Sequence, residues 1–447
     1  MIAGLLSRFG RGEDTPAGVL EDILRRHRAE DHVFISLAAN EARTQAASAT
    51  ERWRSGRPAG YLDGLAVAIK DCVDVVGLRT TNGSVVDASP DPITRDAGIV
   101  RVLRERGAVT IGKTNLSELA FSGVGINPHY GSPVNPLSGH EPLVTGGSSS
   151  GSAAAVATGQ VPLAIGTDTS GSVRVPAAFC GIVGYKASEG RYPHDGVRTL
   201  SSTLDTLGFL TRSAADLGLV VAALEPGSGL SGPGATRPVR LAVPEDHEVV
   251  ADATPAVAAW FHDQLEELAA LDGVRVERRA LPVLAEAQEL MDTYGTLVAA
   301  EAFSGYGQLL DGPSEGLLDP AVARRLRYAS TVGRTIGPVR VRMAELRERL
   351  AVELAGALLL CPTVRCLPPS VAQVTASDDV FDQWNARILR TTMLLSYLGM
   401  PGVSVPRGLG RQHGLGLLVS APSGYDHAAI RAAQLLDDRP RTPENHR

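Results

Sequence analysis

Two glycine- and serine-rich segments contain the side chains that could do chemistry. They read TGGSSSGS over residues 145–152 and TDTSGS over 167–172. A serine hydroxyl becomes a nucleophile when a base lies within hydrogen-bond reach, and free backbone N–H groups can stabilise a developing negative charge. A helix of small residues (about 152–159) and a short apolar strand (about 161–165) are expected between them. We therefore predict that the two segments form two walls of one pocket.

A lysine follows an apolar run further upstream. Leu65–Ile69 is expected to be a short buried strand, and Lys70 comes directly after it. Burying an ammonium group is costly, so one interpretation is that Lys70 reaches solvent from the end of the strand. The alternative is a buried lysine whose pKa is lowered by desolvation, so that the neutral amine acts as a base toward a serine.

Short apolar strands alternate with helical segments along the chain, which indicates an α/β layered fold. The expected helices are two within 16–53, then 99–106, 152–159, 214–224, 255–271, 284–310, 320–357, 384–398 and 426–436. The expected strands are 65–69, 108–111, 161–165, 239–243, 274–277, 358–362, 402–405 and 416–419. Residues 1–436 are expected to form a single domain, and 437–447 a disordered tail.

The composition argues against several other functions. The 447 residues carry a net charge of −6, and no dense block of lysine and arginine predicts nucleic-acid binding. No apolar run approaches the roughly 18 residues of a membrane span, and the N-terminus is unlike a signal peptide. The four cysteines form no CxxC pair and the ten histidines lack zinc-ligand spacing. We expect a cytoplasmic protein with no metal, no cofactor and no membrane or nucleic-acid partner.

Three short matches to known motifs conflict with their sequence context. Gly107–Thr114 fits the phosphate-loop pattern GxxxxGK[ST], but its centre, Val-Thr-Ile, is typical of a strand. Gly147–Gly151 fits the GxSxG nucleophile elbow of α/β-hydrolases, but loop residues precede it where a buried strand is needed. Gly227–Gly232 fits GxGxxG, but proline follows instead of a helix, which predicts a linker.

The order of four motifs resembles the amidase signature family of serine hydrolases. They are AVAIKD (66–71), GAVTIGKTNLSE (107–118), GGSSSGSAAAVA (146–157) and GTDTSGSVRVPAAFCGIVGYK (166–186). Two further stretches, SSTLDTLGFLTRSAADL (201–217) and GMPGVSVP (399–406), add to the likeness. The resemblance implies a large mixed central β-sheet covered by helices on both faces. It is dense over about 62–217, the signature core, whereas the substrate-side region of about 225–395 is more divergent.

The resemblance also implies a Ser–Ser–Lys triad. Ser172 matches the nucleophile, Ser148 the bridging serine on a cis peptide bond, and Lys70 the base. The matching oxyanion-hole donors are the backbone N–H groups of Thr169, Ser170, Gly171 and Ser172. Ser170 departs from the family pattern, which usually has glycine there, and this departure could narrow the pocket.

Neighbouring polar residues are given structural roles. We expect Ser149 and Ser150 to be structural hydrogen-bonding groups and not catalysts. Asp168 and Arg174 are expected to form a buried ion pair that holds the second turn. Cys180 is expected to lie in the core.

The implied activity is hydrolysis of a carbon–nitrogen amide bond of a small molecule. It would proceed through a Ser172 acyl-enzyme, with Lys70 acting as base through Ser148. Tyr294–Phe303 and Asn385–Pro406 resemble amidases of small metabolites, including the carboxybiuret and allophanate hydrolase type. A homodimer is compatible with the resemblance. Two alternatives stay open: the glutaminase subunit of a tRNA amidotransferase, and a biosynthetic member that passes the acyl group to an amine.

Overall fold

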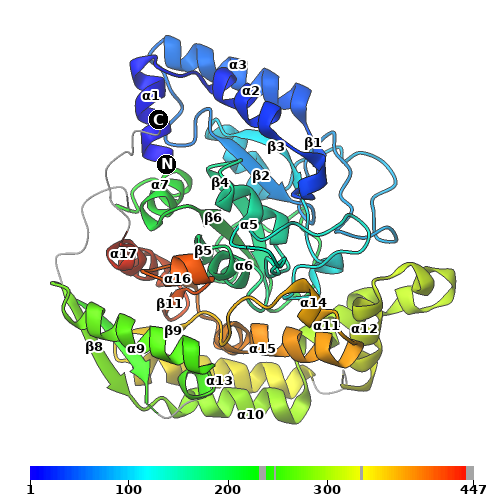
Figure 1. Ribbon diagram of the computed structural model, residues 1–447, viewed down its shortest axis with the longest axis vertical. Coiled ribbons are helices and arrows are strands. Elements are labelled where there is room, and N and C mark those ends of the chain that lie inside the picture. The colour runs from blue at the N-terminus through cyan, green and yellow to red at the C-terminus, as the bar shows by residue number, and fades with distance from the viewer. Residues whose placement is uncertain (231–237, 246–247, 333–335, 439–447) are drawn as a thin grey trace.

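One mixed β-sheet organises the described part of the chain in this computed structural model, namely residues 1–230, 238–245, 248–332 and 336–438 (Figure 1). Its 11 strands are ordered β1-β3-β2-β4-β6-β5-β10-β11-β9-β7-β8. The strands are β1 (Phe34–Leu37), β2 (Ala66–Lys70), β3 (Val109–Thr114), β4 (Leu163–Asp168), β5 (Val183–Lys186), β6 (Thr206–Thr211), β7 (Val239–Pro244), β8 (Val274–Arg279), β9 (Leu358–Pro362), β10 (Gly402–Val405) and β11 (Leu417–Ser420). The α-helices are α1 (Ile2–Arg11), α2 (Pro16–Arg26), α3 (Ala39–Arg54), α4 (Gly98–Glu105), α5 (Ser150–Ala157), α6 (Arg174–Phe179), α7 (Ala214–Leu224), α8 (Glu248–Ala251), α9 (Pro255–Ala269), α10 (Pro282–Tyr294), α11 (Leu297–Tyr306), α12 (Pro320–Val332), α13 (Ile336–Leu354), α14 (Val371–Val374), α15 (Asp378–Tyr397), α16 (Gly410–His413) and α17 (Asp426–Leu436).

The sheet combines parallel and antiparallel pairs, as predicted. β2 runs parallel to both of its neighbours, β3 and β4. β7 runs parallel to β8 and β9. The other neighbouring strands are antiparallel.

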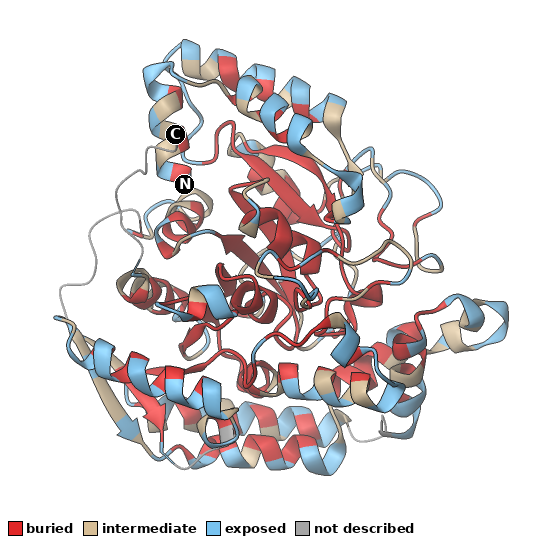
Figure 2. Cartoon of the chain, viewed as in Figure 1, coloured by how far each residue is buried: buried red, intermediate tan, exposed pale blue. Residues whose placement is uncertain are grey.

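Alternate residues of β2 pack into two different hydrophobic cores. Val67 and Ile69 belong to a core that includes residues of α4, α7 and α17. Ala66 and Ala68 belong to a second core that includes residues of α2, α3 and α5. Because successive side chains of a strand point to opposite faces, helices cover both faces of the sheet, which confirms the predicted fold class. Figure 2 shows the buried strands at the centre and the exposed outer side of helices such as α3.

The structure contains the predicted elements, with shifts at their ends, and several more. α7 and β10 have the predicted bounds, and the helical stretch predicted at 320–357 consists of α12 and α13. Eight of the α-helices and strands were not predicted: α1, β1, α6, β5, β6, α8, α14 and α16. β1 is a short, partly buried strand. β6 has a glycine in its interior, which weakens the sequence signal of a strand.

The motif interpretations can be compared with these elements. Val109–Thr114 is the buried strand β3, so the strand interpretation of the phosphate-loop match is confirmed. Loop residues precede Gly147, as the argument against the GxSxG elbow requires. The predicted linker at 227–232 and the predicted tail at 437–447 lie partly outside the described residues. None of the helices in the described part of the chain has both the length and the apolar character needed to cross a membrane.

Candidate active site

Lys70 is the last residue of β2 and lies beside the end of β4. Because β2 and β4 are parallel, their carboxyl ends meet at one edge of the sheet. The Lys70 side chain is fully buried. Its Nζ donates hydrogen bonds to Ser148 Oγ at 2.7 Å and to Thr167 Oγ1 at 2.8 Å. The solvent-exposed interpretation of Lys70 is therefore wrong, and the alternative that the lysine is buried is confirmed.

A second buried lysine, Lys113 on β3, differs from Lys70 in having a carboxylate partner. Lys113 Nζ lies 2.6 Å from Asp71 Oδ1, so the charge of this lysine is paired. Among the described residues, no carboxylate forms an ion pair with Lys70. Burial lowers the pKa of Lys70, and the negative charges of neighbouring groups, including Asp205, oppose that shift. Desolvation without a counter-ion favours the neutral amine.

Ser148 follows a cis peptide bond, as the resemblance implies. The Gly147 N–H donates to the Gly123 carbonyl at 2.7 Å, which fixes the chain just before Ser148. The Ser149 N–H donates to the Ser172 carbonyl at 3.1 Å. This last hydrogen bond joins the two Gly/Ser segments, so their predicted proximity is confirmed.

Ser172 lies two residues before α6 and is 5% exposed. Its hydroxyl makes no hydrogen bond to another described residue. The described structure therefore contains the Lys70–Ser148 hydrogen bond of the predicted triad but none between the hydroxyls of Ser148 and Ser172.

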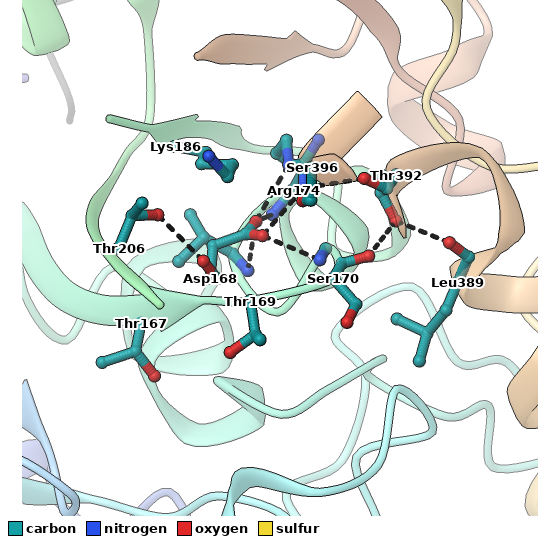
Figure 3. A network of polar contacts seen from close by, with 12 residues as sticks. Thr167, Asp168, Thr169, Ser170, Arg174, Lys186, Thr206, Leu389, Thr392 and Ser396 are labelled. Atoms are coloured by element: carbon teal, nitrogen blue, oxygen red, sulfur yellow. Dashed lines mark hydrogen bonds and ion pairs between the residues drawn. The ribbon is translucent and has the colours of Figure 1, made fainter. Parts of the chain in front are cut away.

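The turn that carries Ser172 is held by a buried ion pair, as predicted (Figure 3). Arg174 Nε lies 2.9 Å from Asp168 Oδ2, and Nη2 lies 2.8 Å from Oδ1. Both side chains are fully buried. Burial alone would raise the pKa of Asp168, but the Arg174 guanidinium outweighs that effect and holds the pKa at about 2. Asp168 is therefore a stable carboxylate at the base of the turn.

The backbone donors of this turn are not all equivalent. The Gly171 N–H already donates to Asp168 Oδ1 at 2.7 Å, so it is engaged within the protein. The N–H groups of Thr169, Ser170 and Ser172 have no acceptor among the described residues. These three groups are the free donors of the predicted oxyanion hole.

Several residues at the site lie outside the predicted set. Thr167 accepts a hydrogen bond from Lys70, and Asp205 accepts one from Thr169 Oγ1 at 2.6 Å. Burial raises the pKa of Asp205 to about 6, against hydrogen bonds from Thr169 and two backbone N–H groups. Thr392 of α15 donates to the Ser170 carbonyl. The spacing of the motifs gives no signal for a contact from so distant a segment.

The remaining structural predictions have mixed outcomes. Ser149 Oγ donates to the Thr167 carbonyl at 3.4 Å, which confirms its structural role. The buried Ser150 hydroxyl has no hydrogen-bond partner among the described residues, so the prediction that it is a structural hydrogen-bonding group is wrong. Cys180 is buried in the core, as predicted.

Similar proteins define the class of this enzyme. A solved amidase structure has a TM-score of 0.80 and 30% sequence identity, covering 96% of this chain and 97% of that chain. A 2-amino-5-chloromuconic acid deaminase from Comamonas testosteroni is 32% identical over 468 residues, covering 97% of this chain and 98% of that protein. A glutamyl-tRNA(Gln) amidotransferase subunit from Chloroflexus aurantiacus is 33% identical over 367 residues, covering 78% of this chain and 72% of that protein. The fold and these relatives identify a hydrolase that acts on carbon–nitrogen amide bonds.

The family assignment follows from nearly the whole chain. The family model named Amidase matches residues 19–430. The chain belongs to the amidase family.

Proposed function

We propose that this protein hydrolyses the amide bond of a small molecule through an acyl-enzyme on Ser172. The observation that carries the proposal is the environment of Lys70. This lysine is fully buried, has no paired carboxylate among the described residues, and contacts Ser148 Oγ at 2.7 Å. A neutral lysine next to a hydroxyl can accept the proton of that hydroxyl. The hydroxyl oxygen can then accept the proton of a serine nucleophile.

The proposed first step is proton transfer along three residues. Ser148 gives its proton to Lys70 and takes the proton of Ser172, whose oxygen attacks the amide carbonyl carbon. The carbonyl oxygen becomes an oxyanion. The free N–H groups of Thr169, Ser170 and Ser172 are the donors for it, while the Gly171 N–H remains bonded to Asp168. This step requires the Ser172 hydroxyl to rotate toward Ser148 when substrate is bound.

The same groups complete the cycle. The Lys70 ammonium returns a proton through Ser148 to the departing nitrogen, and the carbon–nitrogen bond breaks. Water then attacks the ester on Ser172 while Lys70 and Ser148 accept its proton. The carboxylic acid product leaves and Ser172 recovers its hydrogen.

The extent of the similarity supports a small-molecule substrate. The deaminase from Comamonas testosteroni matches over nearly the full length of both chains, whereas the amidotransferase subunit matches over 78% of this chain. The amidotransferase relationship makes a partner-dependent glutaminase the second candidate.

The test uses the purified chain alone. We expect ammonia release from at least one member of a panel of small primary amides, and a fluorophosphonate adduct that mass spectrometry maps to Ser172. Ser172→Ala is expected to lower the rate by at least about a thousandfold because it removes the nucleophile. The matched control is Ser149→Ala, expected to stay within about threefold of the wild type because Ser149 only contacts backbone.

Three results would contradict the proposal. Labelling of Ser149 with Ser172 unmodified would overturn the nucleophile. Glutamine hydrolysis only in the presence of partner proteins would favour the amidotransferase function. Acyl transfer to added hydroxylamine with no hydrolysis in its absence would favour a biosynthetic transferase.

A further inference from the structure

We propose that Thr392 is a positioning residue for the oxyanion hole: its hydroxyl fixes the Ser170–Gly171 peptide and thereby the free N–H groups on either side. This inference rests on the proposed function. It assigns a role in catalysis to α15, a helix of the divergent part of the chain.

The central contact joins residues that lie far apart in the sequence. Thr392 Oγ1 donates to the Ser170 carbonyl at 2.5 Å, across 222 residues of chain. A threonine within a helix ordinarily donates to a carbonyl of its own preceding turn, and Thr392 Oγ1 does lie 3.1 Å from the Leu389 carbonyl. The hydroxyl has one hydrogen, and the shorter distance is to Ser170. Thr392 is fully buried, so water does not replace this donor.

The Ser170 carbonyl and the Gly171 N–H belong to the same planar peptide unit. Thr392 holds the carbonyl, and Asp168 Oδ1 accepts the N–H at 2.7 Å. With both ends bonded, this peptide cannot rotate without breaking a buried hydrogen bond. The N–H groups of Ser170 and Ser172 belong to the two neighbouring peptides, so fixing the plane between them restricts their directions.

Gly171 allows Thr392 to come this close. Its φ of +133° is a conformation that residues with a side chain rarely adopt. A Cβ atom at this position would overlap the Thr392 hydroxyl. The backbone geometry and the contact with α15 therefore depend on each other.

Arg174 attaches the same segment of α15 to the turn a second time. Its Nη2 donates to the Thr392 carbonyl at 3.1 Å and to Ser396 Oγ at 2.8 Å (Figure 3). Since Arg174 is also paired with Asp168, these interactions form a closed ring from Asp168 through Arg174, Thr392 and the Ser170–Gly171 peptide back to Asp168. Such a ring holds a peptide more firmly than any one of its bonds does.

The test removes one hydroxyl and compares two positions. Thr392→Val has nearly the shape of threonine but cannot donate, whereas Thr392→Ser keeps the donor. The matched control is Thr211→Val: Thr211 is also buried, and its Oγ1 donates to the Ser213 carbonyl at 2.9 Å, at the end of β6 that pairs with the start of β4 and not with Asp168. Each variant is assayed for kcat and KM on the best amide, for the rate of fluorophosphonate inactivation, and for Tm.

We expect Thr392→Val to lower kcat and the inactivation rate together by about tenfold, with KM within about twofold, because the oxyanion forms after substrate binding. Thr392→Ser and Thr211→Val are expected to stay within about threefold of the wild-type kcat. Should Thr392→Val not fold, Thr392→Ala and Thr392→Ser, which differ by the hydroxyl, provide the same comparison.

The outcomes separate this inference from the proposed function. An active wild type with Thr392→Val equally fast, or with Thr211→Val equally impaired, overturns the role of Thr392 and leaves the proposed function intact. A wild type that neither hydrolyses amides nor is labelled at Ser172 overturns the proposed function and this role with it.

Discussion

Replacing Arg174 by methionine tests the buried ion pair that holds the turn carrying Ser172. The variant replaces the guanidinium by an apolar side chain and leaves the Asp168 carboxylate buried without its ion-pair partner. Asp168 has a pKa of about 2 in the folded protein, compared with an ordinary value of about 3.9. That difference corresponds to roughly 2–3 kcal/mol of stability at neutral pH. Loss of the hydrogen bonds to Thr392 and Ser396 adds to it, so we expect a total cost of about 3–5 kcal/mol, as for other broken buried pairs.

The cost of the substitution is expected to depend on pH in a definite direction. In the wild type the Asp168 pKa is depressed, so its contribution is present above about pH 4 and is lost as the pH falls toward 2. In Arg174→Met the buried carboxylate loses its ion-pair partner and keeps only the weaker attraction of Lys186, so burial is expected to raise its pKa above the ordinary value. Protonation then relieves the buried charge as the pH falls. The cost of the substitution is therefore expected to be smaller at pH 5 than at pH 7.

The assay is urea unfolding followed by tryptophan fluorescence at the two pH values. The control is Arg25→Met, because Arg25 forms an exposed ion pair with Asp22 at 2.7 Å. Exposed pairs contribute less than about 1 kcal/mol. A cost for Arg174→Met that equals the control at pH 7, or that grows on going to pH 5, would refute the reasoning.

Three further predictions concern the same edge of the sheet. The proposed mechanism uses Lys70 as the neutral amine, so kcat/KM is expected to increase with pH, with a midpoint below pH 10.5, the ordinary pKa of lysine. Asp205→Asn removes a negative charge that raises the Lys70 pKa and is expected to move that midpoint to lower pH in a pH–rate profile. Lys113→Met leaves Asp71 buried and unpaired and is expected to lower the free energy of unfolding, measured in urea, by about 3–5 kcal/mol. Lys70→Met is expected to lower it by less than about 1 kcal/mol and to lower activity at least about a thousandfold. Equal losses of stability in the two variants would contradict this prediction. Gly171→Ala is expected to lower the unfolding free energy by more than about 1 kcal/mol because of its positive φ, and an unchanged Tm would contradict this.

The sequence was most informative where function depends on a short continuous segment. Lys70 follows an apolar strand, and Ser148 lies within an unusual run of small residues, so both positions were predictable, and their hydrogen bond is present. The buried pair of Asp168 and Arg174 was also predictable, because the two residues lie on one turn.

The contacts that were missed depend on how the chain returns to the site. Asp205 contacts Thr169 from the loop before β6, a strand that was not predicted because its interior glycine weakens the sequence signal. Thr392 reaches Ser170 from α15, which has the pattern of an ordinary amphipathic helix. Local patterns indicate which face of a helix is buried, but not which backbone carbonyl that face meets.

The order of strands in the sheet has a consequence for how the chain matures during synthesis. Strands β1 to β6 can pair among themselves as soon as they leave the ribosome, and so can β7, β8 and β9, which form a separate group. These groups become one sheet only when β10 and β11 insert between β5 and β9. Until then the nascent protein has two open strand edges at β5 and β9, in addition to the outer edges at β1 and β8, where a neighbouring polypeptide can add a strand. The helix that brings Thr392 to Ser170 directly precedes β10, so this contact and closure of the sheet both depend on the same late-synthesised segment.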